Sequence, residues 1–281
     1  MMAAIINRKQ LKQDMKNLLA NAQVSPKAMT ALYLGIILVM NLVVDVFAGD
    51  TGLLSTFISI LSSLVSLVLF SGFALYCMAV RRGERAEFLT LFDGFSFVGK
   101  IIALNVIMYA FIMLWSMLFV IPGIIASYRY RFALFNLYEN PGISVMEALN
   151  MSKRQTYGYK TQLLMLDLSY VGWTILSSIP SFVYSLTFYQ ELLAQSMTAF
   201  GVGTISVAPI AVFSTRLLPV WIWTLIMDLW QLVVAMFYLP TYQCVELGYF
   251  DIAKSTSGVG AGASPHHQNP WSDGPDNMGD F

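Results

Sequence analysis

The stretch IPGIIASYRYRFALF, residues 121–135, places Arg129 and Arg131 inside one of the most apolar parts of the chain. The whole chain is 57% hydrophobic and only 11% charged, with a mean hydropathy of +0.65, whereas soluble domains carry about 25% charged residues. Apolar runs long enough to cross a bilayer as helices recur along it. The sequence therefore predicts an all-α, polytopic membrane helix bundle, and the two arginines decide how many spans it has.

Two topologies are compatible with the region around these arginines. If the third span runs on to about residue 127 and Arg129 begins a loop, five spans result. The excess of basic residues on the inner side is then small. If Pro122 and Gly123 instead form a tight outer turn, residues 121–139 return as a sixth span. All basic residues except the two embedded arginines and Arg216 then lie on one side. The positive-inside rule favours this six-span model, with N- and C-termini cytosolic.

The six predicted spans and their connections form a membrane domain over residues 28–254. The spans are expected at residues 28–48, 53–80, 101–120, 121–139, 162–186 and 217–245. Residues 187–216 form an outer loop, and residues 255–281, rich in Gly, Pro, Asn and Asp, form a disordered tail. A stripe of serines along the second span permits close helix packing in lipid; a polar permeation path is the alternative interpretation of this stripe.

Two short helices are predicted at the cytosolic surface, outside the spans. Residues 1–27 contain an amphipathic helix with Asn7 as its N-cap. Its lysines fit either a helix that lies on an anionic inner leaflet or an ordinary exposed helix. Residues 144–158 contain a second helix, in which Ser144 and Glu147 form a capping box. The lipid bilayer with its anionic inner leaflet is therefore an expected partner.

Arg129 and Arg131 need partners in this topology, because an arginine near the bilayer centre costs about 2.5 to 3.5 kcal/mol on insertion scales. The last two spans supply one buried acid each, Asp167 and Asp228. From a rise of 1.5 Å per residue, Asp228 lies at a depth similar to that of Arg131, so these two form the preferred ion pair in a candidate intramembrane polar network. Carbonyl groups near a proline, or water at the surface, are alternative partners, and a substrate or ion site is the alternative role.

Several kinds of chemistry have no support in the composition. Cys77 and Cys244 are the only cysteines, and His266 and His267 are the only histidines. We therefore expect no Cys/His metal site and no histidine-based catalytic pair. The net charge is zero and basic blocks are absent from the sequence, so nucleic acid is not an expected partner. No catalytic residue and no cofactor are expected, and both cysteines are expected as free thiols near the cytosolic face.

Three stretches together resemble an integral-membrane family of Gram-positive bacteria, domain of unknown function 975. They are NRKQLKQDMK at residues 7–16, IPGIIASYRYRFALF at 121–135 and NPGISVMEALNMSKRQTYGYK at 140–160. With Trp173 and Pro240-Thr241-Tyr242, the resemblance extends to about residue 253. It implies a multi-pass protein of the bacterial plasma membrane and supplies no activity.

Three functional hypotheses follow. The first is a non-enzymatic membrane scaffold, assembly or regulatory protein with a membrane-protein partner. The alternative is a small-solute or ion transporter or channel that uses the buried Arg and Asp residues. A membrane enzyme could use Asp167, Asp228 or Glu139 for acid/base work, but no paired carboxylates lie at useful spacing on one helix.

Overall fold

The computed structural model describes residues 5–47, 52–199 and 220–260, and within them the chain is all-α, with no strand. The elements in chain order are α1 (Arg8–Ala20), α2 (Pro26–Phe47), α3 (Leu53–Arg82), the 3-10 helix η1 (Phe88–Phe97), α4 (Val98–Leu118), α5 (Val120–Arg129), α6 (Ala133–Glu139), α7 (Val145–Gln155), α8 (Lys160–Leu168), α9 (Val171–Ala199) and α11 (Val220–Ser257).

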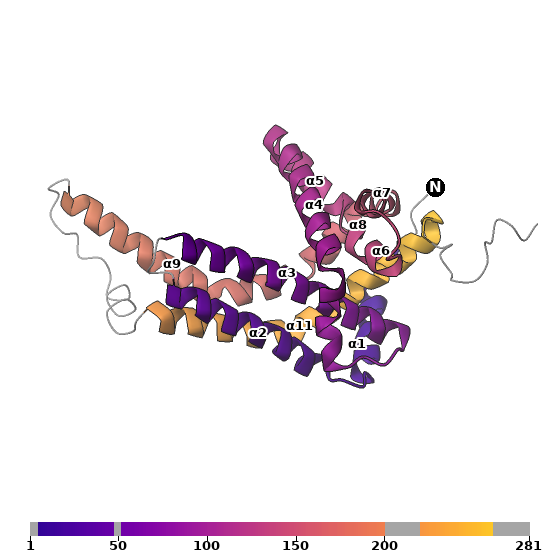
Figure 1. Cartoon of the computed structure of the whole chain (residues 1–281), viewed down its shortest axis with the longest axis horizontal. Coiled ribbons are helices and arrows are strands. Elements are labelled where there is room, and N and C mark those ends of the chain that lie inside the picture. The colour runs from indigo at the N-terminus through magenta and orange to yellow at the C-terminus, as the bar shows by residue number, and fades with distance from the viewer. Residues whose placement is uncertain (1–4, 48–51, 200–219, 261–281) are drawn as a thin grey trace, which may run out of the picture.

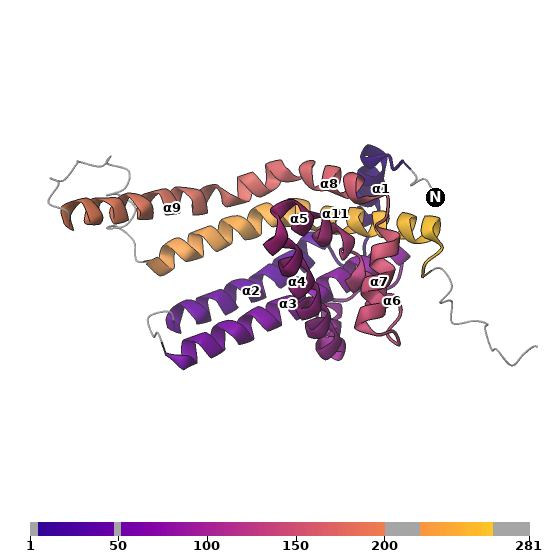
Figure 2. The ribbon, with the colours of Figure 1, turned by 90° about the horizontal axis from the view of Figure 1, so that it is seen from above.

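Four long helices, α2, α3, α9 and α11, run side by side along the longest axis of the molecule in both views (Figures 1 and 2). Helix α11 packs against α2 and α9, and α2 packs against α3. Their outer faces are apolar, and Phe57, Ile60 and Phe237 are each more than half exposed. Contiguous exposed apolar surface is rare on soluble monomers, so these faces are suited to lipid.

Four helical segments of the described chain are long and apolar enough to cross a membrane. They are Pro26–Asp45, Leu53–Arg82, Phe88–Leu118 and Ile222–Ser257. Helix α8 and the first part of α9, to Leu186, add a fifth if this pair, bent by 50°, forms one broken span. The described residues thus contain four or five possible spans, and the predicted count of six is not confirmed.

The predicted fourth span, residues 121–139, does not form one helix. Helix α5 has 10 residues and ends at Arg129, and α6 has 7 residues and begins at Ala133. Neither approaches the roughly 20 residues that cross a bilayer. Helices α4 and α5 form a hairpin that projects sideways from the long bundle instead of running along it (Figure 1).

The turn of this hairpin lies at Phe119, so the predicted turn at Pro122 and Gly123 was wrong in position. Phe119 is extended, with φ −160° and ψ 152°, and precedes the first residue of α5. Pro122 lies in the first turn of α5, where a missing N–H costs little because N–H groups there have no helical partner. Gly123 packs against α4: a Cβ on it would lie 2.0 Å from Ser116 Oγ. These residues start α5 and let the hairpin close.

Several other boundaries differ from the expected ones. Helix α9 continues through residues 187–199, the first part of the predicted outer loop, and residues 200–216 lie outside the described residues. Helix α11 continues past residue 245 to Ser257, because its last three turns bury Tyr249 and Phe250 in the core. Of the predicted tail, residues 261–281 lie outside the described residues.

The segment between α3 and α4 contains η1. It packs so closely on α3 that Gly72 has no room for a side chain, since a Cβ there would lie 1.8 Å from the carbonyl oxygen of Leu91. The contact fixes η1 on the side of α3 before the chain enters α4. Glycine at residue 72 is therefore a packing requirement.

Basic residues collect at one end of the bundle, which we call the basic end. Residues 28–80, 161–199 and 220–253 contain no Lys or Arg. The basic residues of the described chain instead occupy α1, α5 and α7, the starts of α2, α4 and α8, the ends of α3 and α11, and the connections that follow α3 and α5. In Figure 1 these parts lie together at the right, with the start of the described chain and the end of α11. Of the 16 basic residues in the sequence, only Arg216 lies outside the described residues.

The basic end also contains the largest buried core. Phe73 and Tyr76 of α3 and Phe250 of α11 are fully buried there. The Tyr76 hydroxyl donates to the carbonyl oxygen of Val24 at 2.9 Å, which ties α3 to the segment between α1 and α2. Burial of several aromatic side chains contributes about 1.5 to 3 kcal/mol each, so this end is the best-packed part of the molecule.

Ion pairs between distant segments reinforce that packing. Arg81 at the end of α3 contacts Asp251 of α11 at 2.5 Å. Glu139 at the end of α6 accepts from Arg82 and from Lys254, each at 2.7 Å. The ends of α3, α6 and α11 are thereby held together.

Candidate functional site

The site begins with the break between α5 and α6. Side chains of α7 replace the helical hydrogen bonds that the break removes. Ser152 Oγ donates to the carbonyl oxygen of Arg129 at 2.9 Å and accepts from the Phe132 N–H at 3.0 Å. Thr156 Oγ1 donates to the same carbonyl at 3.2 Å. Ser152 and Thr156 are fully buried, and their hydroxyls remove the cost of buried, unpartnered backbone groups.

The break turns Arg131 toward α8 and α11. Its Nη1 and Nη2 donate to the two carboxylate oxygens of Asp167, at 2.7 and 2.9 Å, and its Nε donates to Glu246 at 2.6 Å. An Arg–carboxylate pair with two parallel bonds is among the strongest polar contacts in proteins. The guanidinium thus joins α8 and α11 through two carboxylates.

Two tyrosines complete the network. Tyr128 donates to Asp167 at 2.7 Å, and Tyr242 donates to the other oxygen of the same carboxylate at 2.7 Å. Tyr242 also accepts a hydrogen bond from Arg131. Both rings lie within 6 Å of the guanidinium carbon, at 5.4 and 5.9 Å, a distance at which cation–π attraction adds to the ion pairs. We call Tyr128, Arg131, Asp167, Tyr242 and Glu246 the Arg131 cluster.

The cluster is partly accessible through Asp167. The Asp167 side chain is 31% exposed, against 16% for Arg131 and 9% for Glu246. Tyr128, Arg131 and Asp167 line a cavity of about 390 Å³, whose other walls come mainly from apolar residues of α3 and α4. Glu246 and Tyr242 do not line this cavity.

The structure brings together only two of the four residues of the predicted network, Arg131 and Asp167. The preferred pairing of Arg131 with Asp228 was wrong. Asp228 instead accepts from Asn41 of α2 at 3.3 Å. The reason is position along α11: Asp228 precedes Glu246 by 18 residues, about 27 Å of helix, and Arg131 lies beside the Glu246 end. The depth estimate assumed a helix over 121–139 parallel to the other spans.

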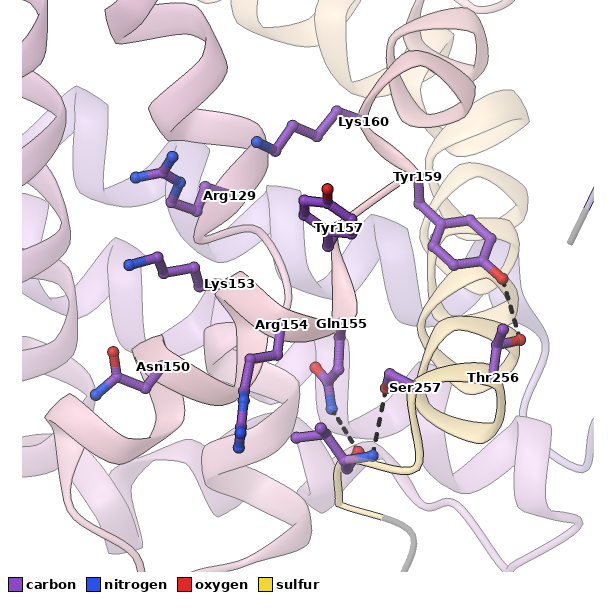
Figure 3. Close-up of a pocket in the computed structure, with 11 residues that line it drawn as sticks. Arg129, Asn150, Lys153, Arg154, Gln155, Tyr157, Tyr159, Lys160, Thr256 and Ser257 are labelled. Atoms are coloured by element: carbon purple, nitrogen blue, oxygen red, sulfur yellow. Dashed lines mark hydrogen bonds between the residues drawn. The ribbon is translucent and has the colours of Figure 1, made fainter. Parts of the chain in front are cut away.

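Arg129 does not contact the acids of the cluster. It lines a separate pocket with residues of α7 and of the start of α8 (Figure 3). The predicted N-caps are present, since Asn7 accepts from the Gln10 N–H and Ser144 accepts from the Glu147 N–H. Of the predicted capping box at Ser144 and Glu147, this is the half that the structure shows. These caps begin α1 and α7.

Sequence reasoning missed Glu246, Tyr242 and Tyr128. Tyr242 and Glu246 are four residues apart, so they lie on one face of a helix, and this spacing could have indicated a polar site at the end of α11. The predicted last span ended at residue 245, one residue before the second carboxylate. Tyr128 belongs to the YRYR segment, of which only the two arginines were predicted to form a polar network.

The fold and the cluster define an all-α protein with four or five helices apolar enough to span a membrane and a buried polar cluster at their basic end. Residues 117–243 match the model of a family described as "Protein of unknown function (DUF975)". The resemblance to this family is thereby confirmed over those residues, which include α5 to α9 and α11 up to residue 243, but only the last two residues of α4. Comparisons with curated proteins and with solved structures found no match.

Proposed function

We propose that this protein is a multi-pass protein of the bacterial plasma membrane whose basic end faces the cytosol and acts as a non-enzymatic platform for assembly or regulation of a membrane-protein partner. One observation carries the proposal: segments far apart in the sequence converge at the basic end, where ion pairs and hydrogen bonds hold them together. Arg81, Glu139 and Lys254 provide the ion pairs, and Arg8 and Lys12 tie α1 to the end of α8.

Orientation follows from the distribution of charge. The basic residues of the described chain lie at one end, and the positive-inside rule assigns such an end to the cytosol. Lys12 donates to Ser169 at 2.8 Å and lies over the Tyr170 ring at 4.0 Å, so α1 is docked on the bundle. Burial and the neighbouring charges of Arg8 and Lys16 lower the pKa of Lys12. Such a fixed polar surface is pre-organised for binding.

Helix α7 provides an accessible face of this platform. Ala148 and Leu149 face the core, while Met146, Glu147 and Asn150 are exposed. Met146 has 47% of its surface exposed although it is a large apolar residue. Methionine is frequent at surfaces that bind other proteins, which makes this face of α7 the candidate contact.

A site-specific photo-crosslinker at Met146 tests the proposal in cells. We expect a discrete crosslinked product with another protein. The matched control is the same group at Phe237, which is 58% exposed on the apolar face of α11 and should give lipid adducts only. Equal protein crosslinking at both residues, or none at residue 146, would contradict the platform proposal.

Transport of a small solute is the second candidate, and the cavity beside Arg131 favours it. Charged groups at membrane depth commonly mark solute pathways. Reconstituted vesicles should then show a solute flux that falls in Tyr128→Phe, which removes only one hydroxyl from the cavity wall. Absence of flux across a broad panel of ions and small solutes would exclude this candidate.

A further inference from the structure

A second pocket at the basic end has a strongly cationic lining. Its volume is about 860 Å³, and it lies between α7, the start of α8 and the end of α11. Four of its lining residues are basic, namely Arg129, Lys153, Arg154 and Lys160, and the lining contains no Asp or Glu. Figure 3 shows the side chains of Arg129, Lys153 and Lys160 extending to the same side of the pocket. We call this space the cationic pocket.

The four cations of the pocket are not neutralised by any acid of the described residues. Within the described residues, none of them forms an ion pair, although Arg81, Arg82, Arg131 and Lys254 all do. Like charges gathered around one space repel one another. An anion with several oxygen atoms would relieve that repulsion and accept hydrogen bonds from more than one side chain.

The pocket is built on a fixed wall. Gln155 is fully buried and exchanges hydrogen bonds with Asn136 at 2.7 and 2.8 Å, and it also donates to the carbonyl oxygen of Val259 at 3.1 Å. The Tyr159 hydroxyl donates to Thr256 at 3.0 Å. These bonds hold the end of α11 against α7 and the α7–α8 connection, which fixes one wall of the pocket.

Its location indicates where a ligand would come from. Lys160 is the first residue of the bent α8–α9 pair, the fifth possible span. A pocket beside the start of a span lies at the level of lipid headgroups, where cationic side chains attract anionic phospholipids. The volume also falls in the range of sites that hold a phosphate with an attached organic group.

We propose that the cationic pocket binds a phosphate-bearing anion at the cytosolic surface of the membrane. Arg129 presents a guanidinium group that suits bidentate contacts with phosphate oxygens, and Lys153 and Lys160 act as point charges on the same side of the pocket. Arg154 extends in another direction and adds positive charge from a different part of the lining. The phosphate belongs either to a lipid headgroup or to a soluble phosphate ester. The proposal goes beyond the platform function; only its cytosolic location rests on the orientation proposed above, whereas anion binding is tested on the purified protein alone.

The test is thermal unfolding of the full chain in a neutral detergent, titrated with four probes. The probes are phosphatidylglycerol, the phosphate-free lipid diacylglycerol, glycerol 3-phosphate, and sodium chloride at matched ionic strength. A ligand that binds the folded state raises the midpoint in proportion to its occupancy. We expect a saturable rise with at least one phosphate probe and none with diacylglycerol or chloride. Response to phosphatidylglycerol alone identifies a lipid, whereas response to glycerol 3-phosphate identifies soluble esters.

Matched variants assign that response to the pocket. Lys153→Gln with Arg154→Gln should weaken the apparent affinity about tenfold or more, as two charge-assisted contacts are lost. Lys27→Gln with Arg85→Gln removes the same charge from exposed residues outside the pocket and should change the affinity less than about threefold. The charge-preserving exchange Lys153→Arg with Arg154→Lys should retain binding, which separates charge from folding defects. Equal affinity in the first two double variants, or no response of the unmodified chain to either phosphate probe, would overturn the proposal.

Discussion

Arg131 forms four hydrogen bonds, as many as Asp167, and all of them lead to α8 or α11. Asp167 holds it from α8, and Glu246 and Tyr242 hold it from α11. A buried ion pair adds little net stability relative to apolar packing, but removal of one partner leaves an uncompensated charge. The cluster therefore fixes the positions of α5, α8 and α11 relative to one another.

Asp167→Asn should lower the free energy of unfolding by about 2 to 3 kcal/mol, less than for a fully buried pair because Asp167 is 31% exposed and Glu246 still neutralises Arg131. Asp228→Asn is the matched control, and we expect a change within about 0.5 kcal/mol. Thermal unfolding of both variants in detergent measures the difference. A larger loss in Asp228→Asn would favour the pairing expected from the sequence.

Ser152 is the residue on which the α5–α6 break depends most. Ser152→Ala leaves the buried Phe132 N–H without an acceptor and should cost about 1 to 3 kcal/mol. Ser63→Ala removes an exposed hydroxyl that bonds only within α3 and should change stability by less than about 0.5 kcal/mol. Denaturant titrations compare the two. Similar midpoints for both variants would show that α7 does not stabilise the break.

Among the elements, those set by short-range patterns were predictable, and those set by distant partners were not. Asn7 and Ser144 cap helices because a side-chain oxygen meets an N–H three residues on, so the sequence alone indicates them. The end of α5 at Arg129 depends on Ser152 and Thr156, more than 20 residues away. No local pattern in residues 121–139 reveals that partner, and the apolar composition alone favoured one continuous helix.

The close contact between α3 and η1 predicts how substitution of Gly72 changes stability. Gly72→Ala places a methyl group where the Leu91 carbonyl lies and should destabilise the protein by about 1 to 3 kcal/mol. Gly35→Ala in α2 meets nothing within 4 Å and should be neutral or stabilising by up to about 1 kcal/mol, since alanine favours the helix. The unfolding midpoints of the Gly72→Ala and Gly35→Ala variants measure this difference. Equal effects would mean that η1 does not pack on α3 as described.

At the scale of the whole molecule, the bundle separates an apolar body from one polar end. The basic end contains the Arg131 cluster, the cationic pocket and α7. The expectation that basic residues gather on one side came from counting charges along the sequence, and the structure places them at one end of the bundle. The path of residues 121–139 could not be obtained in that way, because charge counting treats every long apolar run as a span.

Cysteine labelling in intact cells and inverted vesicles tests the central claim, that the basic end faces the cytosol. The native Cys77 and Cys244 are fully buried, so they can stay in place while single cysteines are added at Lys153 on α7 and at Leu53, at the opposite end of the bundle. A membrane-impermeant thiol reagent should label Leu53→Cys only in intact cells and Lys153→Cys only in inverted vesicles. Labelling of Lys153→Cys in intact cells, or of both residues from the same side, would contradict the account.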